Sequence, residues 1–341
     1  MYMKFLDCTI RDGGYVNNWN FSKNFVRNLY KTLLKCKYNY IELGFRDNLN
    51  SYNDKIVSLW RKSTDKIIKD TIEDIYNNDT KIAVMVNYGS SSLDDFFPKK
   101  KSLVSMVRVA FHKNDLENAI QYINDIKKLG YVVCANAMGT INYSEDEIEF
   151  LCKEIIKYDI DYLYIADSYG SINDIQLKDK VKSIKNTFHN LNHNFKYKLG
   201  FHAHNNTQRA LANVISCKND FNIIDSTMYG MGRGAGNLST ELIISEYCLN
   251  NKYFNDKSVY ECVSFIYNNL LVNELKFENL WGYDLIYFIS GHLNIHPNYA
   301  MKIKEYKIND IDIIWDALYK ISKSDKAFKF YKSYLDNILT N

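Results

Sequence analysis

The sequence predicts a (β/α)₈ barrel followed by a C-terminal helical extension. Eight short β-rich runs recur along the chain, amphipathic stretches separate them, and the last part of the chain has helical patterns with no strands between them. Strands joined by helix-sized connections pair in parallel, and eight such units close into a barrel of about 250 residues. We therefore expect the barrel in residues 1–255, and an extension packed on it in residues 256–341. A doubly wound open sheet is the main alternative, but no GxGxxG turn follows the first run.

The predicted strands are short and rich in β-branched and aromatic residues. They cover Lys4–Thr9, Tyr38–Phe45, Lys81–Tyr88, Met106–Phe111, Tyr131–Met138, Tyr162–Asp167, Lys198–His204 and Ile223–Tyr229. Between them, apolar residues recur at i, i+3, i+4 and i+7, which is the spacing of one helix face. This pattern is clear in Phe21–Leu34, Asp115–Leu129, Ser144–Tyr158 and Asp174–Phe188. In the extension, Val259–Leu271 is expected to pack against the barrel.

The charge balance and the cysteines narrow the class of protein. The chain has 341 residues, with 43 Lys and Arg against 40 Asp and Glu, so a nucleic-acid partner is not expected. No run approaches the roughly 18 apolar residues of a membrane span, and the start MYMKFLDCTIRDGGY has no apolar segment of the signal-peptide type. Seven scattered cysteines without a CxxC pair suit reduced thiols better than disulfides or a zinc site. We expect a cytoplasmic enzyme with no membrane partner.

Three polar clusters follow predicted strands, at the barrel end that carries active sites: LDCTIRDGGY, GFHAHNN and YGMGRGAGN. His202 and His204 stand two apart on a strand, so their imidazoles share one face and can bind one ion. An HxH pair is also found as an ordinary polar pair. Asp12 can join it, because only the eighth strand separates the first strand from the seventh. Two imidazoles and one carboxylate leave about three positions of an octahedral divalent ion open, although non-haem iron oxygenases use the same ligand set.

Arg11 favours a substrate that develops negative charge on oxygen, such as a 2-oxo acid and its enolate. Strict strand alternation would send Arg11 and Asp12 opposite ways, so we expect Gly13 and Gly14 to form a turn that aims both into the barrel mouth. The alternative is a surface arginine at a strand end.

The glycines of YGMGRGAGN can present amides to an anion before a helix near Leu238, or can simply let the strand turn. Asn237, which closes this run, can be a further metal ligand or can orient one. Other polar residues at strand ends are candidates for the pocket or, alternatively, buried structural groups: Glu42, Asn87, Arg108, Asn136, Asp167 and Ser168. Of these we expect Glu42, Asn136 and Ser168 to bind substrate. His112, His189 and His193 are interpreted as bystanders.

Together these motifs resemble the DRE-TIM metallolyase superfamily, most closely its 4-hydroxy-2-oxovalerate aldolase and HMG-CoA lyase-like branch. The matching stretches are LDCTIRDGG, YLYIADSYG, LGFHAHNN, ANVIS and YGMGRGAGN. A fainter likeness continues in WGYDLIYFISGHL, which is similar to the segment that caps the barrel in that branch.

The resemblance implies a role for each matching residue. Asp12, His202 and His204 match metal ligands, usually for Mn²⁺ or Mg²⁺, and Asn237 matches a ligand found in some relatives. Arg11 matches the arginine that stabilises the enolate. Ser168 matches a pocket serine near the oxo acid, and Tyr287 matches a tail tyrosine that reaches into the site.

One position departs from the branch, which carries a basic histidine where this chain has Tyr15. A phenol ordinarily has a pKa near 10 and is a poor base at neutral pH. The alternatives are an activated Tyr15, a metal-bound hydroxide, or His292 or His296 from the tail. The departure leaves the substrate open, including a hydroxy-oxo acid of surface-sugar synthesis.

We therefore predict a class II, metal-dependent aldolase that makes or breaks a carbon–carbon bond next to a 2-oxo acid, with an aldehyde as its second substrate. One alternative is a Claisen-type synthase similar to isopropylmalate synthase, although such relatives favour an acidic residue and glutamine where this chain has Gly14 and Tyr15. Another is a catalytically silent barrel that serves as a binding partner. The resemblance also implies a homo-oligomer or a complex with an aldehyde dehydrogenase.

Overall fold

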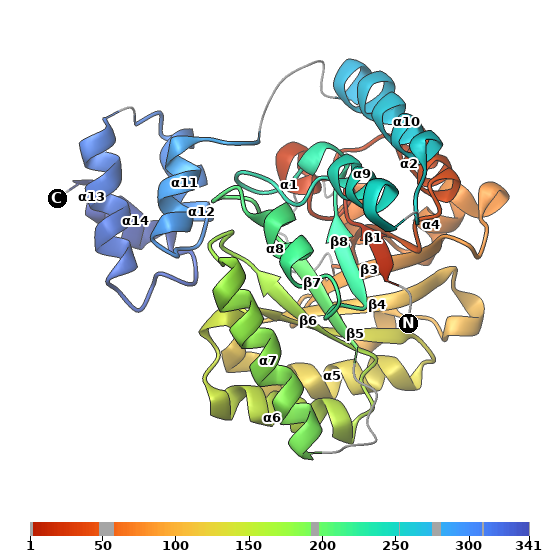
Figure 1. Cartoon of the computed structure of the whole chain (residues 1–341), viewed down its shortest axis with the longest axis horizontal. Coiled ribbons are helices and arrows are strands. Elements are labelled where there is room, and N and C mark those ends of the chain that lie inside the picture. Colours follow the sequence, from red (N-terminus) through yellow and green to blue (C-terminus); the bar gives the residue numbers. More distant parts are fainter. Residues whose placement is uncertain are drawn as a thin grey trace.

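The computed structural model describes residues 3–47, 58–191, 198–251, 253–274, 281–308 and 310–340. Within these residues, eight parallel strands form a closed barrel in chain order, with helices around it (Figure 1). The strands are β1 (Lys4–Asp7), β2 (Tyr40–Phe45), β3 (Lys81–Asn87), β4 (Val104–Phe111), β5 (Val132–Met138), β6 (Tyr162–Asp167), β7 (Leu199–Ala203) and β8 (Ile223–Ser226). β1 pairs with both β2 and β8, which closes the sheet. The predicted barrel is therefore confirmed, and the open sheet is excluded.

The helices follow the amphipathic stretches of the sequence. Those of the barrel are α1 (Gly14–Asn17), α2 (Lys23–Lys35), α3 (Leu59–Lys62), α4 (Asp65–Ile72), α5 (Leu116–Lys128), α6 (Glu145–Lys157), α7 (Asp174–Leu191), α8 (Ala210–Ser216) and α9 (Thr240–Asn251). Short 3₁₀ turns lie at Glu73–Ile75, Leu93–Asp95, Lys99–Lys101, Lys113–Asp115, Thr140–Asn142 and Met228–Gly230. The start of α6 shows how local sequence sets a boundary. Ser144 accepts a hydrogen bond from the Glu147 amide, and the Glu147 side chain accepts one from the Ser144 amide.

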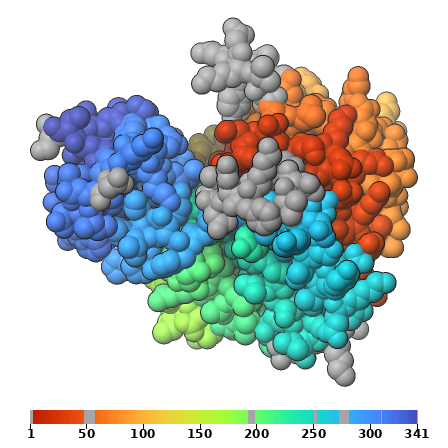
Figure 2. Space-filling model, turned by 90° about the horizontal axis from the view of Figure 1, so that it is seen from above, coloured from red at the N-terminus to blue at the C-terminus, as the bar shows by residue number. Residues whose placement is uncertain are grey.

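The described part of the tail contains helices joined by loops and no strand, as predicted. It contains α10 (Asp256–Phe265), the π-helix Ile266–Glu274, α11 (Leu285–His292), α12 (Asn298–Glu305), α13 (Ile311–Ser322) and α14 (Lys332–Thr340). α10 packs on the barrel, because Cys262 and Phe265 belong to the same apolar cluster as the barrel strands. Helices α11–α14 enclose a cluster of their own and lie beside the barrel (Figure 2). The division at residue 255 stays a prediction.

The barrel interior has two layers of different chemistry. Toward the amino ends of the strands it is filled by apolar and aromatic side chains such as Leu6, Met106 and Tyr162. Above them, Glu42 and Arg108 are fully buried and form an ion pair. A filled interior leaves only the carboxyl ends of the strands open for a site.

Several predicted boundaries shift in the structure. β7 ends at Ala203, one residue before His204, which instead forms an isolated bridge with Asn237. β8 ends at Ser226 rather than Tyr229, because Tyr229 adopts a left-handed conformation with φ of 58°. All seven cysteines are free thiols, as expected. His193, which was interpreted as a bystander, lies outside the described residues. None of the described helices combines the length and the apolar character of a membrane-spanning segment.

Candidate metal centre and active site

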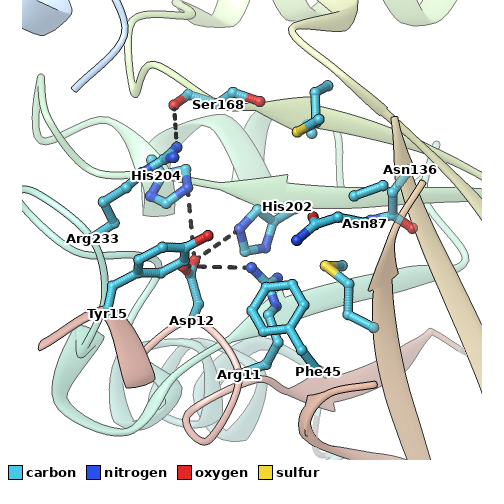
Figure 3. Close-up of a pocket in the computed structure, with 14 residues that line it drawn as sticks. Arg11, Asp12, Tyr15, Phe45, Asn87, Asn136, Ser168, His202, His204 and Arg233 are labelled. Atoms are coloured by element: carbon cyan, nitrogen blue, oxygen red, sulfur yellow. Dashed lines mark hydrogen bonds and ion pairs between the residues drawn. The ribbon is translucent and has the colours of Figure 1, made fainter. Parts of the chain in front are cut away.

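Asp12, His202 and His204 converge at the carboxyl end of the barrel, and all three are buried (Figure 3). Nε2 of His202 lies 3.1 Å from Oδ2 of Asp12, and Nε2 of His204 lies 3.7 Å from the same oxygen. One potential ligand atom from each residue lies within 4.8 Å of the others. Bonds of about 2 Å from one divalent ion span such separations.

The turn after β1 brings Arg11 and Asp12 into the same cavity. The Asp12 amide donates to the Cys8 carbonyl, which closes a helical turn in place of a strand. The Trp19 indole donates to the Arg11 carbonyl at 2.7 Å and packs over the turn. A Cβ atom on Gly14 would lie only 2.1 Å from the Trp19 ring, so this position requires glycine. The turn, and not strand alternation, therefore decides where both side chains point.

The protonation states of Asp12 and His204 suit metal ligands. Burial opposes ionisation of Asp12, but Arg11 and the two imidazoles outweigh it and hold the pKa of this carboxyl well below its usual range. Burial lowers the pKa of His204 to about 3, so this imidazole is neutral. Its Nδ1 is buried without a hydrogen-bond partner, and 3.7 Å to Asp12 is too long for a hydrogen bond at Nε2. A cation between these side chains would satisfy His204, so the residues fit a divalent metal.

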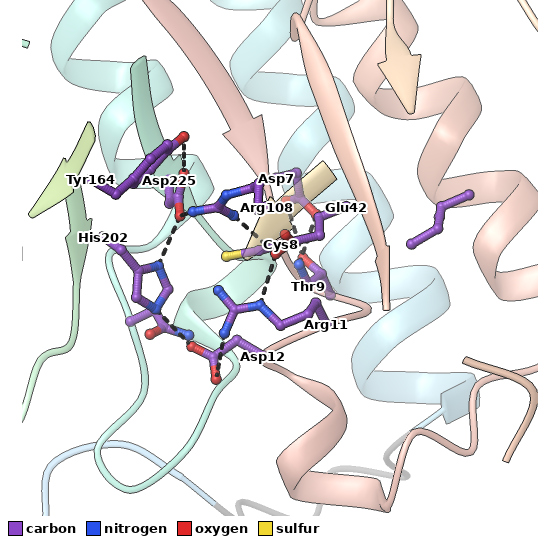
Figure 4. A network of polar contacts seen from close by, with 12 residues as sticks. Asp7, Cys8, Thr9, Arg11, Asp12, Glu42, Arg108, Tyr164, His202 and Asp225 are labelled. Atoms are coloured by element: carbon purple, nitrogen blue, oxygen red, sulfur yellow. Dashed lines mark hydrogen bonds and ion pairs between the residues drawn. The ribbon is translucent and has the colours of Figure 1, made fainter. Parts of the chain in front are cut away.

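Asp225 orients the His202 ring from the side of the barrel interior, with Oδ2 lying 3.0 Å from Nδ1 (Figure 4). Burial and Arg11 act to lower the pKa of His202, but its hydrogen bonds to Asp12 and Asp225 outweigh them and raise it. A carboxylate that receives Nδ1–H leaves Nε2 for the metal, as in carboxylate–histidine–metal arrangements. Sequence reasoning missed Asp225 because it follows an apolar run of β8 without a motif of its own.

Buried ion pairs hold Asp225 and Arg11 in place. Arg108 reaches both Asp225 and Glu42, and Tyr164 donates to Asp225 at 3.1 Å. Glu42 in turn accepts from Nε of Arg11 at 2.7 Å. The predicted substrate-binding residue Glu42 therefore lies under Arg11 and does not line the cavity. Its position below Arg11 reflects strand alternation, which points Glu42 into the filled interior of the barrel.

A second group that can hold an ion, Cys8 with His202 and Asp225, suits a metal less well. Burial raises the pKa of the Cys8 thiol well above its ordinary value, and the thiol donates to the Ser226 carbonyl at 3.4 Å. The thiolate is the form that binds metal. Asp225 is moreover already paired with Arg108. The group of Asp12, His202 and His204 is therefore the better metal site.

The cavity around this group has a volume of about 60 Å³. Six of the candidate residues line it together with the metal group's imidazoles: Arg11, Asp12, Tyr15, Asn87, Asn136 and Ser168. Phe45, Met85, Met138 and Arg233 also line it and were not predicted. Arg233 stands in the motif YGMGRGAGN, of which only the glycines and Asn237 were given a role from the sequence. A charged residue between those glycines was the available signal.

The remaining candidates lie outside the cavity lining, including the buried Arg108 and Asp167. Asn237 is buried next to His204, with Nδ2 donating to the Met231 carbonyl and Oδ1 unpartnered. Tyr287 packs against Ala235 and Ala300. His292 is exposed, stacks on Phe288 and lines a separate cavity.

Of the two tail histidines considered as a base, His296 feels the field of His204, whereas His292 lines a separate cavity. Burial lowers the pKa of His296 well below its ordinary value, and the fields of Arg233, His112 and His204 act in the same direction. Its Nδ1 accepts from the Asn298 amide at 3.2 Å. His296 is therefore a neutral imidazole within electrostatic reach of the metal group.

The chain matches known lyases and aldolases. Residues 2–251 match the HMGL-like family model. The 4-hydroxy-2-oxovalerate aldolase of Bacillus cereus is 24% identical over 248 residues, which cover 71% of this chain and 69% of that protein. The N-terminal domain of a candidate aldolase from Bacteroides vulgatus superposes with a TM-score of 0.76 at 28% identity, covering 91% of this chain and 99% of that one.

The HMG-CoA lyase of Bacillus subtilis shares the fold, with a TM-score of 0.60 at 14% identity over 77% of this chain and 91% of that one. The names of the more similar proteins indicate an enzyme of the lyase or aldolase type. Because the family match covers most of the barrel and includes all three residues of the metal group, the chain belongs to the HMGL-like family of DRE-TIM metallolyases.

Proposed function

We propose that this protein is a divalent-metal-dependent (class II) aldolase that makes or breaks a carbon–carbon bond next to a 2-oxo acid through a pyruvate-type enolate. The observation that carries the proposal is the convergence of Asp12, His202 and His204 in a small cavity that also contains Arg11. The aldolases among its relatives support the reaction class. A cavity of about 60 Å³ suits a substrate group as small as pyruvate.

Asp12, His202 and His204 would hold Mn²⁺ or Mg²⁺. When bound, such an ion supplies Lewis acidity that polarises a carbonyl group. His204 needs no deprotonation to become a ligand, because burial already keeps it neutral. Asp225 keeps the His202 ring in place from its far side.

Arg11 is suited to hold the developing enolate charge. Its Nε donates to Glu42 and its Nη1 pairs with Asp12, which fixes the plane of the guanidinium. Nη2 is buried and has no partner among the described residues, so it remains as a donor to the substrate. One well-placed donor of this kind typically lowers an activation barrier by about 3 to 4 kcal/mol.

Tyr15 is proposed to transfer the proton of the substrate hydroxyl. It is the one tyrosine among the described residues that line the cavity, and its ring packs edge-on against Trp19 at 4.7 Å between centroids. Ser168 is held by the Gly139 amide at 3.1 Å, and Oδ1 of Asn136 is buried without a partner. These two groups are proposed to position the oxo acid. His292 would have to leave its separate cavity to act as a base.

Exchange of pyruvate methyl protons with heavy water tests the proposal most directly. The protein loaded with Mn²⁺ or Mg²⁺ is expected to catalyse the exchange, whereas metal-free protein is not. A panel of aldehydes, with products read by mass, then identifies the acceptor. Release of free thiol from acetyl-CoA would instead support a Claisen-type synthase. A silent barrel predicts neither exchange nor thiol release.

Two further predictions concern the partners of the protein and its location in the cell. A homo-oligomer or a complex with an aldehyde dehydrogenase stays a prediction, which size-exclusion chromatography with light scattering can check. A cytoplasmic location also stays a prediction.

A further inference from the structure

Arg233 brings a second cation to the wall of the metal cavity. Its Nη2 donates to the Ser168 carbonyl at 3.0 Å, and its guanidinium carbon lies 5.6 Å from the centroid of the Tyr15 ring. Its Nε is buried and has no hydrogen-bond partner. Figure 3 shows Arg233 beside Tyr15 and His204, on the side of the cavity away from Asn87 and Asn136.

No acidic side chain neutralises Arg233 within the described residues. Arg11 pairs with Asp12 and Glu42, and Arg108 pairs with Glu42 and Asp225, whereas no carboxylate oxygen lies within 4.0 Å of the Arg233 guanidinium in that part of the chain. Arg233 is half-buried, so its charge is only partly hydrated, and a nearby anion would stabilise it. A ligand with a negative charge would supply that partner.

A second, larger cavity adjoins the metal cavity that Arg233 lines. The metal cavity shares Met138 with a second cavity of about 370 Å³ at the ends of β4 and β5. His112, Lys113 and Lys329 line the second cavity together with two acids, Asp115 and Asp325. Arg233 and Met138 both line the metal cavity, and Met138 also lines the second cavity.

We propose that Arg233 binds a carboxylate or phosphate group on the aldehyde partner, so that the enzyme prefers an anionic aldehyde over a neutral one of the same length. The inference rests on the proposed aldolase function. Arg11 and the metal group serve the 2-oxo acid, whereas Arg233 stands beside Tyr15, the group proposed to transfer the proton and therefore one that the aldehyde must approach. Arginine suits both anions because its planar fork donates two parallel hydrogen bonds.

Matched pairs of aldehydes test the proposal with the metal-loaded enzyme and pyruvate. One pair is 4-oxobutanoate and butanal, and the other is glyceraldehyde 3-phosphate and glyceraldehyde. For at least one pair, kcat/KM for the anionic aldehyde is expected to exceed that for the neutral aldehyde about tenfold or more. The pair that shows the preference identifies the anion as carboxylate or phosphate.

Arg233→Gln is expected to lower this specificity ratio about tenfold or more, and Arg233→Lys, which keeps the charge, is expected to restore part of it. Arg209→Gln is the matched control, because it removes the same charge from an exposed position on the same end of the barrel. A ratio that Arg233→Gln leaves unchanged, or an equal loss with both members of each pair, would overturn the anion site.

A binding measurement keeps the inference independent of turnover. Succinate or inorganic phosphate is expected to raise the thermal unfolding midpoint of the wild-type protein and of Arg209→Gln, and to do so much less in Arg233→Gln. Equal shifts in all three proteins, or no shift in any, would overturn the inference. If pyruvate proton exchange fails while the shift still depends on Arg233, the aldolase proposal falls and the anion site stands.

Discussion

Nδ1 of His202 lies 3.0 Å from Oδ2 of Asp225, while Nε2 of the same ring faces Asp12 at 3.1 Å. The imidazole is thus held between two buried carboxylates, one beneath the cavity and one in its wall. Asp225 does not line the cavity, but Arg108 and Tyr164 fix it from behind. The orientation of a candidate metal ligand is therefore set by residues of the barrel interior.

Asp225→Asn is expected to weaken Mn²⁺ binding about 10- to 100-fold, because the amide is a weaker acceptor for Nδ1–H and orients His202 less firmly. Calorimetric titration measures the Kd, and thermal unfolding checks that the variant is folded. Tyr164→Phe is the matched control, since it removes only the phenol's hydrogen bond to Asp225 and is expected to change the Kd far less. An unchanged Kd in Asp225→Asn would show that Asp225 does not orient the ligand.

Arg11→Gln is expected to lower turnover roughly a hundredfold while metal content stays near that of the wild type. The physical reason is that Nη2 is lost as a donor to the enolate, while Asp12, His202 and His204 remain in place. Steady-state kinetics and metal analysis of the same preparation measure both quantities. Arg11→Lys keeps the charge without the fork and is expected to recover only part of the activity. Full activity in Arg11→Gln would remove this residue from the mechanism.

Tyr15→Phe is expected to lower the rate of aldol cleavage about a hundredfold or more, in the range typical of a lost proton-transfer group. Metal affinity, measured in parallel, is expected to stay within a few fold. His292→Ala is the comparison, because that imidazole lies in a separate cavity. A larger loss in His292→Ala than in Tyr15→Phe would reverse the proposed assignment and require movement of the tail.

The free energy of unfolding is expected to depend on pH through Asp7, which is the last residue of β1 and contacts the start of α9. Burial raises the pKa of this carboxyl to about 7, although Thr9 and Thr240 donate hydrogen bonds to it. Between about pH 4 and 7 the folded state holds a proton that the unfolded state lacks, so stability falls as the pH rises through this window.

Asp7→Asn is expected to remove up to about 1.4 kcal/mol per pH unit from that slope, since one proton is involved. Urea denaturation of the wild type and the variant from pH 4.5 to 8 measures the difference. Asp94→Asn, at an exposed position, is the control. Parallel slopes in the wild type and Asp7→Asn would contradict an uncharged Asp7 at low pH.

The order of elements and the metal group were predictable because both depend on short-range pattern. Alternation of β-rich runs with amphipathic stretches predicts a parallel barrel, and closure then brings β1 and β7 to either side of β8. His202 and His204 stand two apart in a strand sequence, so their common face follows from strand geometry. Asp12 needed one further assumption, a tight turn, and Gly14 makes that turn sterically feasible.

The rest depended on contacts that only the folded chain creates. Whether Glu42 faces the substrate or supports Arg11 depends on which side chains fill the barrel interior. Asp225 can orient His202 because Arg108, which lies 117 residues away in the sequence, holds it in place. The position of His292 in one cavity and of His296 near another depends on how α11–α14 dock on the barrel. The sequence by itself therefore determined the fold and the residues of the candidate metal group. The tertiary structure decided which charges are neutralised, because burial and charge pairing depend on positions in space rather than on sequence order. Among the described residues it left Arg233 without an acidic partner.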